Sequence, residues 1–477
     1  MSQLPQEILD LFIDHFADSP AELKALSLVA KSWLPRTRKH LFRRLHIAPL
    51  PSYSSSKGEQ DYADRMAALA EAFEGFLHTP EIVRCIKVVI MGRHGSGMFR
   101  LLKQRRDSKS LLHRMASALK GRLQVLTSNY DGPCIEPTLN AHICALFALP
   151  SNRIEFLSYD LNVDRLRSQS SLANFSDILQ SSRLWLKHLS LQNVDIIPST
   201  GSTCLDLLEC IAAYAPSLET LCLSVRLYVA IYNDLDVATF RQNAQKPGTH
   251  GLIAPIAMSR FCLQNGCPSH ILEIVLFENN HLTFKNLVYL TIEHVLISVF
   301  DKPSCLQNLK HLTLYEHLGE CFCDLSEYNA VQFHHLSLPS LTHLQLFVSH
   351  LQSMIVILCR AVLGPSKATK TSYDRMRELL EYPKNDSVHL PAQTVEHGLH
   401  LHIQLLEGGL WPTSYCPSID AILHSYLNIG PSELCGPVER ITINRNDDLA
   451  QEYWPLTWRT GRIGPGEADF WWDRERW

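Results

Sequence analysis

The chain has 477 residues, of which 46% are hydrophobic and 19% are charged, and its formal net charge is −4 at pH 7. This length and apolar content suffice for a large buried core, so the composition excludes wholesale disorder. The charge balance gives no global basic field for nucleic acid or an anionic membrane, and no apolar run approaches the roughly 18 residues of a membrane span.

Cysteine usage indicates the compartment. The 14 cysteines form no CxxC pair and no regular framework, which is typical of reduced thiols rather than of a disulfide scaffold. The N-terminus has neither a basic region nor a cleavable apolar segment, so we expect a protein of the cytoplasm or nucleus.

Residues 1–47 carry the pattern of three short helices. The first helix has an i, i+4 stripe of three apolar residues, Ile8, Phe12 and Phe16. Ser19 and Glu22 have capping-box spacing for a second helix, which should end before Pro35. A third helix would place Leu41 and Leu45 on one side. Because so short a segment is too small for a free-standing core, we expect its exposed apolar positions to meet a partner.

The same segment is rich in basic side chains, which are Lys31, Arg36, Arg38, Lys39, Arg43 and Arg44. They could indicate contact with nucleic acid. However, no aromatic platform for bases is interleaved with them, so a solvated charged face is the favoured interpretation.

Three strings in this segment resemble an F-box. They are LPQEI at 4–8, LSLVAKSW at 26–33 and LFRRL at 41–45. Their order and spacing are similar to those of the F-box families of mushroom-forming (basidiomycete) fungi, although Ala30 stands where those families often have cysteine. The resemblance covers residues 4–47 only.

The resemblance implies a three-helix module that binds a Skp-type adaptor, which in turn docks the chain onto a cullin scaffold. Carried over by position, the residues that contact or support the adaptor are Leu4, Pro5, Ile8, Val29 and Trp33. The pattern of residues alone leaves open an ordinary helical cap over the region that follows.

A linker and one helix are predicted for residues 48–80. The stretch 49–60 is polar and rich in serine, which is typical of a loop. Residues 62–78 then have helical periodicity.

From residue 81 to residue 446 a short pattern recurs, in which apolar residues stand at positions i, i+3 and i+5. Clear copies begin at Leu186, Leu218, Leu287, Leu309 and Leu341, and weaker ones begin at Val83, Leu123, Ile154 and Val438. Several starts are 32 residues apart, which predicts one strand per repeat in an α/β solenoid resembling leucine-rich repeats.

The solenoid should be irregular. The place where leucine-rich repeats usually carry asparagine or cysteine holds Val194, Arg226, Val295, His317 and Ser349. Insertions near 226–269 and 364–398 are too long for simple connections, so we expect helices or extended loops there.

Strand alternation predicts which side chains leave the core. One outward row would hold His188, Thr220, Tyr289, His311 and His343. The next would hold Ser190, Cys222, Thr291, Thr313 and Gln345, and a third would hold Gln192, Ser224, Glu293, Tyr315 and Phe347. Such a polar and aromatic surface suits a protein segment, with His188, Tyr289, His311, Tyr315, His343 and Phe347 as candidate substrate-binding residues. Packing against neighbouring rungs is the alternative.

No catalytic constellation, metal site or cofactor site is predicted. The glycine-rich stretch 92–97 lacks the lysine and the hydroxyl residue of a phosphate loop, and Cys321 and Cys323 with His334 and His335 match no structural zinc spacing. The tail 447–477 holds five of the eight tryptophans, which favours a cap on the solenoid over a recognition element.

Together these features predict an N-terminal F-box-like domain at 1–47 and an irregular α/β solenoid. The predicted function is a non-enzymatic substrate-recognition adaptor of a Skp/cullin/F-box-type ubiquitin ligase, with no nucleic-acid or membrane partner. An F-box scaffold without ubiquitin transfer, or an enzyme with an unrecognised pocket, are the alternatives.

Overall fold

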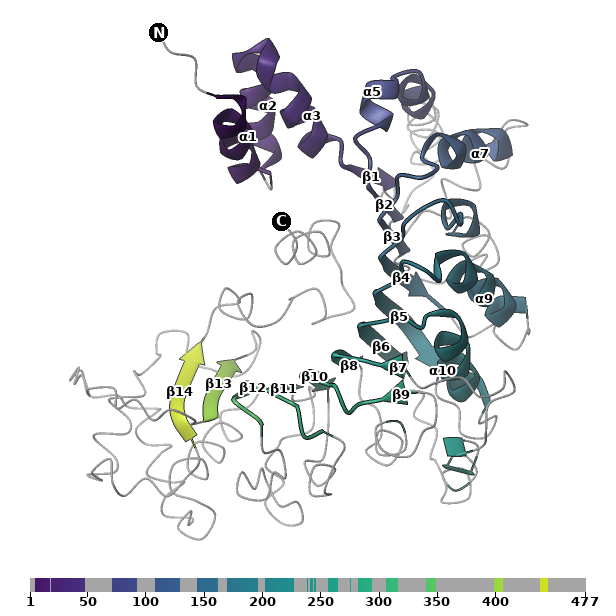
Figure 1. The fold of residues 1–477 in the computed structure, drawn as a ribbon, viewed down its shortest axis with the longest axis vertical. Coiled ribbons are helices and arrows are strands. Elements are labelled where there is room, and N and C mark those ends of the chain that lie inside the picture. Colours follow the sequence, from purple (N-terminus) through teal and green to yellow (C-terminus); the bar gives the residue numbers. More distant parts are fainter. Residues whose placement is uncertain are drawn as a thin grey trace, which may run out of the picture. The chain divides into compact units, whose positions relative to one another are not determined.

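The computed structural model describes residues 5–17, 19–47, 71–91, 108–128, 144–161, 170–195, 202–226, 256–264, 282–293, 306–315, 340–348, 399–405 and 438–444, together with residues 238, 241–242, 244–245 and 275. The chain forms two compact units (Figure 1). Among these residues, the first unit runs from the N-terminus to Asp195 and includes Asp206–Leu218. The second contains the rest of the sheet, beginning at Glu219.

The N-terminal segment forms three helices and one short 3-10 turn, which we call the helical module. Its elements are α1 (Gln6–His15), α2 (Pro20–Val29), η1 (Lys31–Trp33) and α3 (Leu34–Leu41). Prolines stand in the first turns of α2 and α3, where a missing backbone donor costs nothing. The module buries only Ile13, Leu23 and Thr37.

The end of the module differs from the prediction. The predicted third helix carries Leu41 and Leu45 on one side, whereas α3 ends at Leu41 and Leu45 lies in a strand, β1 (Arg44–Ile47). Phe42, Leu45 and Ile47 have the i, i+3, i+5 spacing of the later repeats. The sheet therefore begins inside the segment that resembles an F-box.

The first unit contains five parallel strands in chain order. They are β1, β2 (Val88–Met91), β3 (Val125–Ser128), β4 (Phe156–Asp160) and β5 (His188–Asp195). Between the strands lie residues 71–77, which are helical, and the helices α5 (Pro80–Val83), α7 (Ser108–Ala118) and α9 (Ser170–Ser182). The helix α10 (Ser202–Tyr214) follows β5. In Figure 1, α7 and α9 lie on the same side of the strands.

The repeated apolar positions form the core of this unit. Leu186, Leu189 and Leu191 are all buried, and α9 adds Phe175, whose ring stacks on that of Tyr159 with centroids 5.5 Å apart. Each such side chain contributes about 1.5–3 kcal/mol when fully buried.

One predicted copy was out of register. The sequence predicts Val83, Ile86 and Val88 as the motif of β2, but Val89 pairs with Leu126 of β3. The motif is therefore Ile86, Val89 and Met91. The prediction was misled by Val83, a buried apolar residue that stands three positions before Ile86 but belongs to the core-facing side of α5.

Backbone hydrogen bonds tie each rung to the next. The Lys87 carbonyl accepts bonds from the N–H groups of Gln124 (2.9 Å) and Val125 (3.2 Å). The buried Asn152 side chain adds a cross-link, since its Nδ2 donates to the Phe147 carbonyl (2.7 Å) and its Oδ1 accepts from the Arg122 N–H (3.1 Å).

The second unit continues the same design with seven parallel strands. They are β6 (Thr220–Arg226), β8 (Arg260–Gln264), β10 (Tyr289–Glu293), β11 (His311–Tyr315), β12 (His343–Val348), β13 (Leu399–Leu405) and β14 (Val438–Asn444). A separate pair is formed by β7 (Ile256–Ala257) and β9 (Leu282–Thr283).

Two of these strands were not predicted. Helices or extended loops were expected in 226–269, yet β8 lies there as a full rung between β6 and β10. Met258, Phe261 and Leu263, all buried, have the repeat spacing. The strand β13 shows plain apolar alternation. The stretch 49–60, the insertion 364–398 and the tail 447–477 lie outside the described residues.

The fold is thus a mostly parallel sheet with intervening helices, consistent with an α/β solenoid-like fold. Within the part of the chain that the structure describes, no helix has both the length and the apolar character to cross a bilayer.

Candidate functional site

The helical module presents large apolar side chains to solvent. The exposed fractions are 87% for Leu28, 65% for Leu11, 63% for Val29, 49% for Ile8 and 48% for Phe12. Ile8, Leu11 and Phe12 have i, i+3, i+4 spacing and share one side of α1. A module that exposes more large apolar side chains than it buries has the character of an interaction surface. We call these five residues the apolar surface.

Aromatic contacts support part of this surface. The Phe12 ring lies 5.9 Å from the Trp33 ring and 5.2 Å from that of Phe16, measured between centroids. The turn η1 places Trp33 there, and the Thr37 hydroxyl donates to the Trp33 carbonyl at 3.0 Å.

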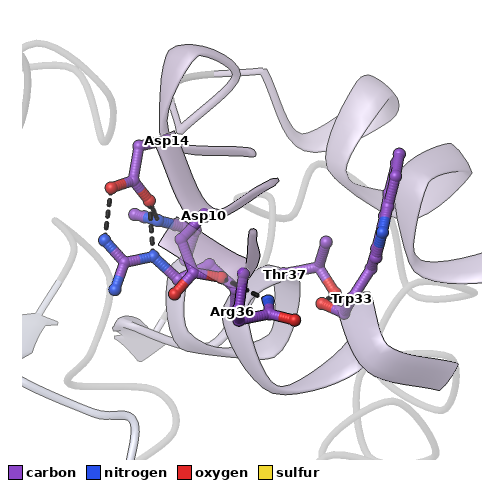
Figure 2. A network of polar contacts seen from close by, with 7 residues as sticks. Asp10, Asp14, Trp33, Arg36 and Thr37 are labelled. Carbon is purple, nitrogen blue, oxygen red and sulfur yellow. Dashed lines mark hydrogen bonds and ion pairs between the residues drawn. The ribbon is translucent and has the colours of Figure 1, made fainter. Parts of the chain in front are cut away.

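A polar network joins α1 to α3 (Figure 2). The Asp14 carboxylate accepts bonds from Arg36 Nε (2.6 Å) and from Arg36 Nη2, and it lies 2.7 Å from His40 Nε2. The hydrogen bond from Arg36 is the main reason that the pKa of Asp14 lies below its usual range, and the same contact raises the pKa of Arg36. The charged network links α1 to α3 in a module that buries few apolar side chains.

The predicted adaptor-binding residues fall into three groups. Leu4 lies outside the described residues. Pro5, Ile8 and Val29 are exposed, and Trp33 is half-buried beside Phe12.

Sequence reasoning missed Leu11 and Leu28 as exposed members of the surface. It also missed the Asp14 network. Arg36 and His40 follow Asp14 by 22 and 26 residues, which is too far for any local pattern to reveal.

A second candidate site lies on the second unit, where four side chains on neighbouring strands form what we call the stacked row. Arg260 Cζ lies 4.5 Å from the centroid of the Tyr289 ring. Tyr289 stacks on His311 at 4.4 Å with an interplanar angle of 10°, and His311 stacks on His343 at 4.5 Å and 19°. All four side chains are half-buried.

Strand register produces this row, since Arg260, Tyr289, His311 and His343 are direct partners in the parallel ladders. In register with them, β13 and β14 carry His400 and Arg440. Cation–π and ring-stacking contacts of this kind fix the orientation of the side chains.

The Thr342 side chain connects the stacked row to the neighbouring rung. Its hydroxyl lies 3.1 Å from the Lys310 carbonyl oxygen and 2.9 Å from His343 Nδ1. The Lys310 carbonyl also accepts from the backbone N–H groups of Thr342 (3.0 Å) and His343 (2.9 Å). These contacts anchor the end of the row at His343.

The predicted substrate-binding residues are only partly brought together. Tyr289, His311 and His343 are in the stacked row, whereas His188 lies in the first unit, paired with Phe156. Tyr315 and Phe347 are register partners on β11 and β12, but their side chains are not among those described. Arg260 was missed because its strand was missed.

Four of the five residues in the second predicted outward row are not at the surface. Ser190, Cys222, Thr291 and Thr313 are buried, so the alternative, packing against neighbouring rungs, is correct for them. Strands about 4.8 Å apart leave small side chains covered by those of the adjacent rungs. The Thr291 hydroxyl even lacks a hydrogen-bond partner.

Comparisons with known proteins add no assignment: no protein-family model and no characterised protein matches the chain. Among the described residues, no group of three or more His, Cys, Asp or Glu side chains is placed to hold a metal ion. The stretch 92–97 and the residues Cys321, Cys323, His334 and His335 lie outside the described residues.

Proposed function

We propose that the chain is a substrate-recognition adaptor of a Skp/cullin/F-box-type ubiquitin ligase, working in the cytoplasm or nucleus. The observation that carries the proposal is the apolar surface on a module with almost no core of its own. Burial under a partner would remove this surface from water, at about 25 cal/mol per Å².

In this proposal the chain performs no bond chemistry. The helical module binds the Skp-type adaptor, and through it the cullin, while the sheet holds a protein substrate. Tethering the substrate and the conjugating enzyme to one assembly raises their effective concentration. This is the only way in which the chain would increase the rate of ubiquitin transfer.

The stacked row is the proposed substrate contact. Its rings are already fixed in orientation by one another, so little side-chain freedom is lost when a protein segment binds. Arginine and tyrosine are also common anchors of protein interfaces.

Two leucines provide a matched test of the adaptor interface. Leu28 is 87% exposed on the apolar surface, and Leu184 is 78% exposed elsewhere in the first unit. The intact chain and the Leu184→Asp variant should capture a Skp-type adaptor and a cullin from extract, and Leu28→Asp should capture neither. Equal capture by Leu28→Asp, or no capture by the intact chain, would contradict the proposal.

A scaffold without ligase activity would pass that test, so a second assay separates the two roles. Ubiquitylation of a protein captured together with the assembled complex supports a ligase. Adaptor binding without ubiquitylation of any captured protein supports the scaffold.

A further inference from the structure

Four basic residues lie shortly before the first three strands of the sheet. Lys39 lies in the last turn of α3, Arg43 precedes β1, Lys87 precedes β2, and Arg122 lies in the turn before β3. We call these four residues the basic cluster.

Backbone hydrogen bonds place two members of the cluster, Arg43 and Lys87, on adjacent rungs. The Arg43 carbonyl accepts from the Lys87 N–H at 2.8 Å, and the Lys87 carbonyl accepts from the Gln124 N–H at 2.9 Å. Arg43, Lys87 and Gln124 therefore occupy equivalent positions on successive rungs, about 4.8 Å apart. Glu155, on the next rung, is the first acid at this position.

Acidic residues are scarce in the sequence around Lys39 and Arg43. The sequence has no Asp or Glu from residue 23 to residue 58. Among the described residues, Lys39, Lys87 and Arg122 form no ion pair, whereas Arg36 nearby in sequence is held by Asp14 and Arg114 by Glu74.

The like charges are close enough to affect one another. Partial burial lowers the pKa of Lys87, and repulsion from Arg122, Lys39 and Arg43 lowers it further. Such repulsion destabilises the folded chain and would be relieved by a bound anion.

We propose that the basic cluster binds an acidic segment of a partner protein, with several carboxylates within a few residues. The carboxylates of such a segment would complement the charges of the cluster. The cluster forms a second contact, separate from the apolar surface, and does not depend on the adaptor role.

Nucleic acid is the less favoured occupant. Within two positions of these four residues in the sequence, the only Phe, Tyr or Trp is Phe42, which is partly buried, so the local sequence offers no exposed ring of this kind on which bases could stack.

The test uses the full chain and a fluorescent octaglutamate peptide. The probed variant is Lys39→Gln/Lys87→Gln/Arg122→Gln. The control variant is Arg183→Gln/Lys285→Gln/Lys310→Gln. It removes the same total charge from three exposed side chains outside the cluster. Loss of three cation–carboxylate contacts should weaken binding about tenfold, and the control should bind like the intact chain.

Thermal unfolding guards against a folding artefact. Removing mutually repelling charges should leave the probed variant at least as stable as the intact chain. Equal octaglutamate binding by the probed and intact chains, or no binding by the intact chain at about 0.05 M salt, would overturn the proposal. Tighter binding of an oligouridylate of equal length through the same residues would overturn the choice of partner. None of these outcomes depends on capture of a Skp-type adaptor.

Discussion

The helical module and the rungs of the first unit use apolar residues in opposite ways. In the rungs, Leu186, Leu189 and Leu191 all point inward and are buried. In the module, Leu11 and Leu28 are exposed, and a charged network around Asp14 connects α1 to α3. Apolar residues therefore build the core in one region and face solvent in the other.

Truncation of a core side chain should have the largest effect on the free energy of unfolding. Leu189→Ala removes a side chain that is 1% exposed and should lower the free energy of unfolding by about 2–5 kcal/mol. Leu28→Ala should change it by less than about 0.5 kcal/mol. Denaturant unfolding of both variants tests this, and similar losses would show that Leu28 is part of a core.

The charged network should have an intermediate effect. Asp14→Asn weakens the contacts with Arg36 and His40 and should cost about 1 kcal/mol at neutral pH, because the network is partly exposed. The control is Asp10→Asn, since Asp10 accepts a hydrogen bond from Gln6 one turn away and its charge raises the pKa of Arg36 less than that of Asp14 does. Urea unfolding at neutral pH should rank Asp14→Asn clearly below Asp10→Asn.

Acid should remove the contribution of the Asp14 carboxylate to stability. The pKa of Asp14 is lowered in the folded chain, so its stabilisation is present above the unfolded value of about 4 and is lost as the pH falls below it. The gap in stability between the intact chain and Asp14→Asn should therefore narrow as the pH falls through about 4. A gap that stays constant down to about pH 2.5 would show that the carboxylate charge is irrelevant.

The stacked row should affect stability no more than the charged network does. His311→Ala removes the ring between Tyr289 and His343 and should cost about 1 kcal/mol, whereas His311→Phe keeps a ring there and should cost less. Thermal unfolding distinguishes the two variants. Identical melting temperatures for both would mean that the stack contributes nothing to the fold.

Local spacing in the sequence predicts much of this fold. The i, i+3, i+5 pattern found β5, β6, β10, β11 and β12, because the same apolar positions enter the core on every rung. It failed at β8 because Met258 and Phe261 are not the leucines that mark the other copies. It failed at β1 because Leu45 also fitted a helix.

The candidate sites were harder to predict. Alternation identifies side chains that leave one face of a strand, but not whether neighbours then cover them, as at Thr291 and Thr313. Contacts across the fold, such as that of Asp14 with Arg36, need the tertiary structure. The sequence favoured a solvated face for Lys39 and Arg43, and no local pattern linked Arg43 to Lys87, which lies at the same position on the next rung.

The most direct test of the central claim is a calorimetric titration of a purified Skp-type adaptor into the purified full chain. If the apolar surface binds the adaptor, the intact chain and Leu184→Asp should both bind it, with a negative heat-capacity change from burial of that surface. Leu28→Asp should show no measurable binding. Absence of binding by the intact chain, or unchanged affinity of Leu28→Asp, would contradict the account.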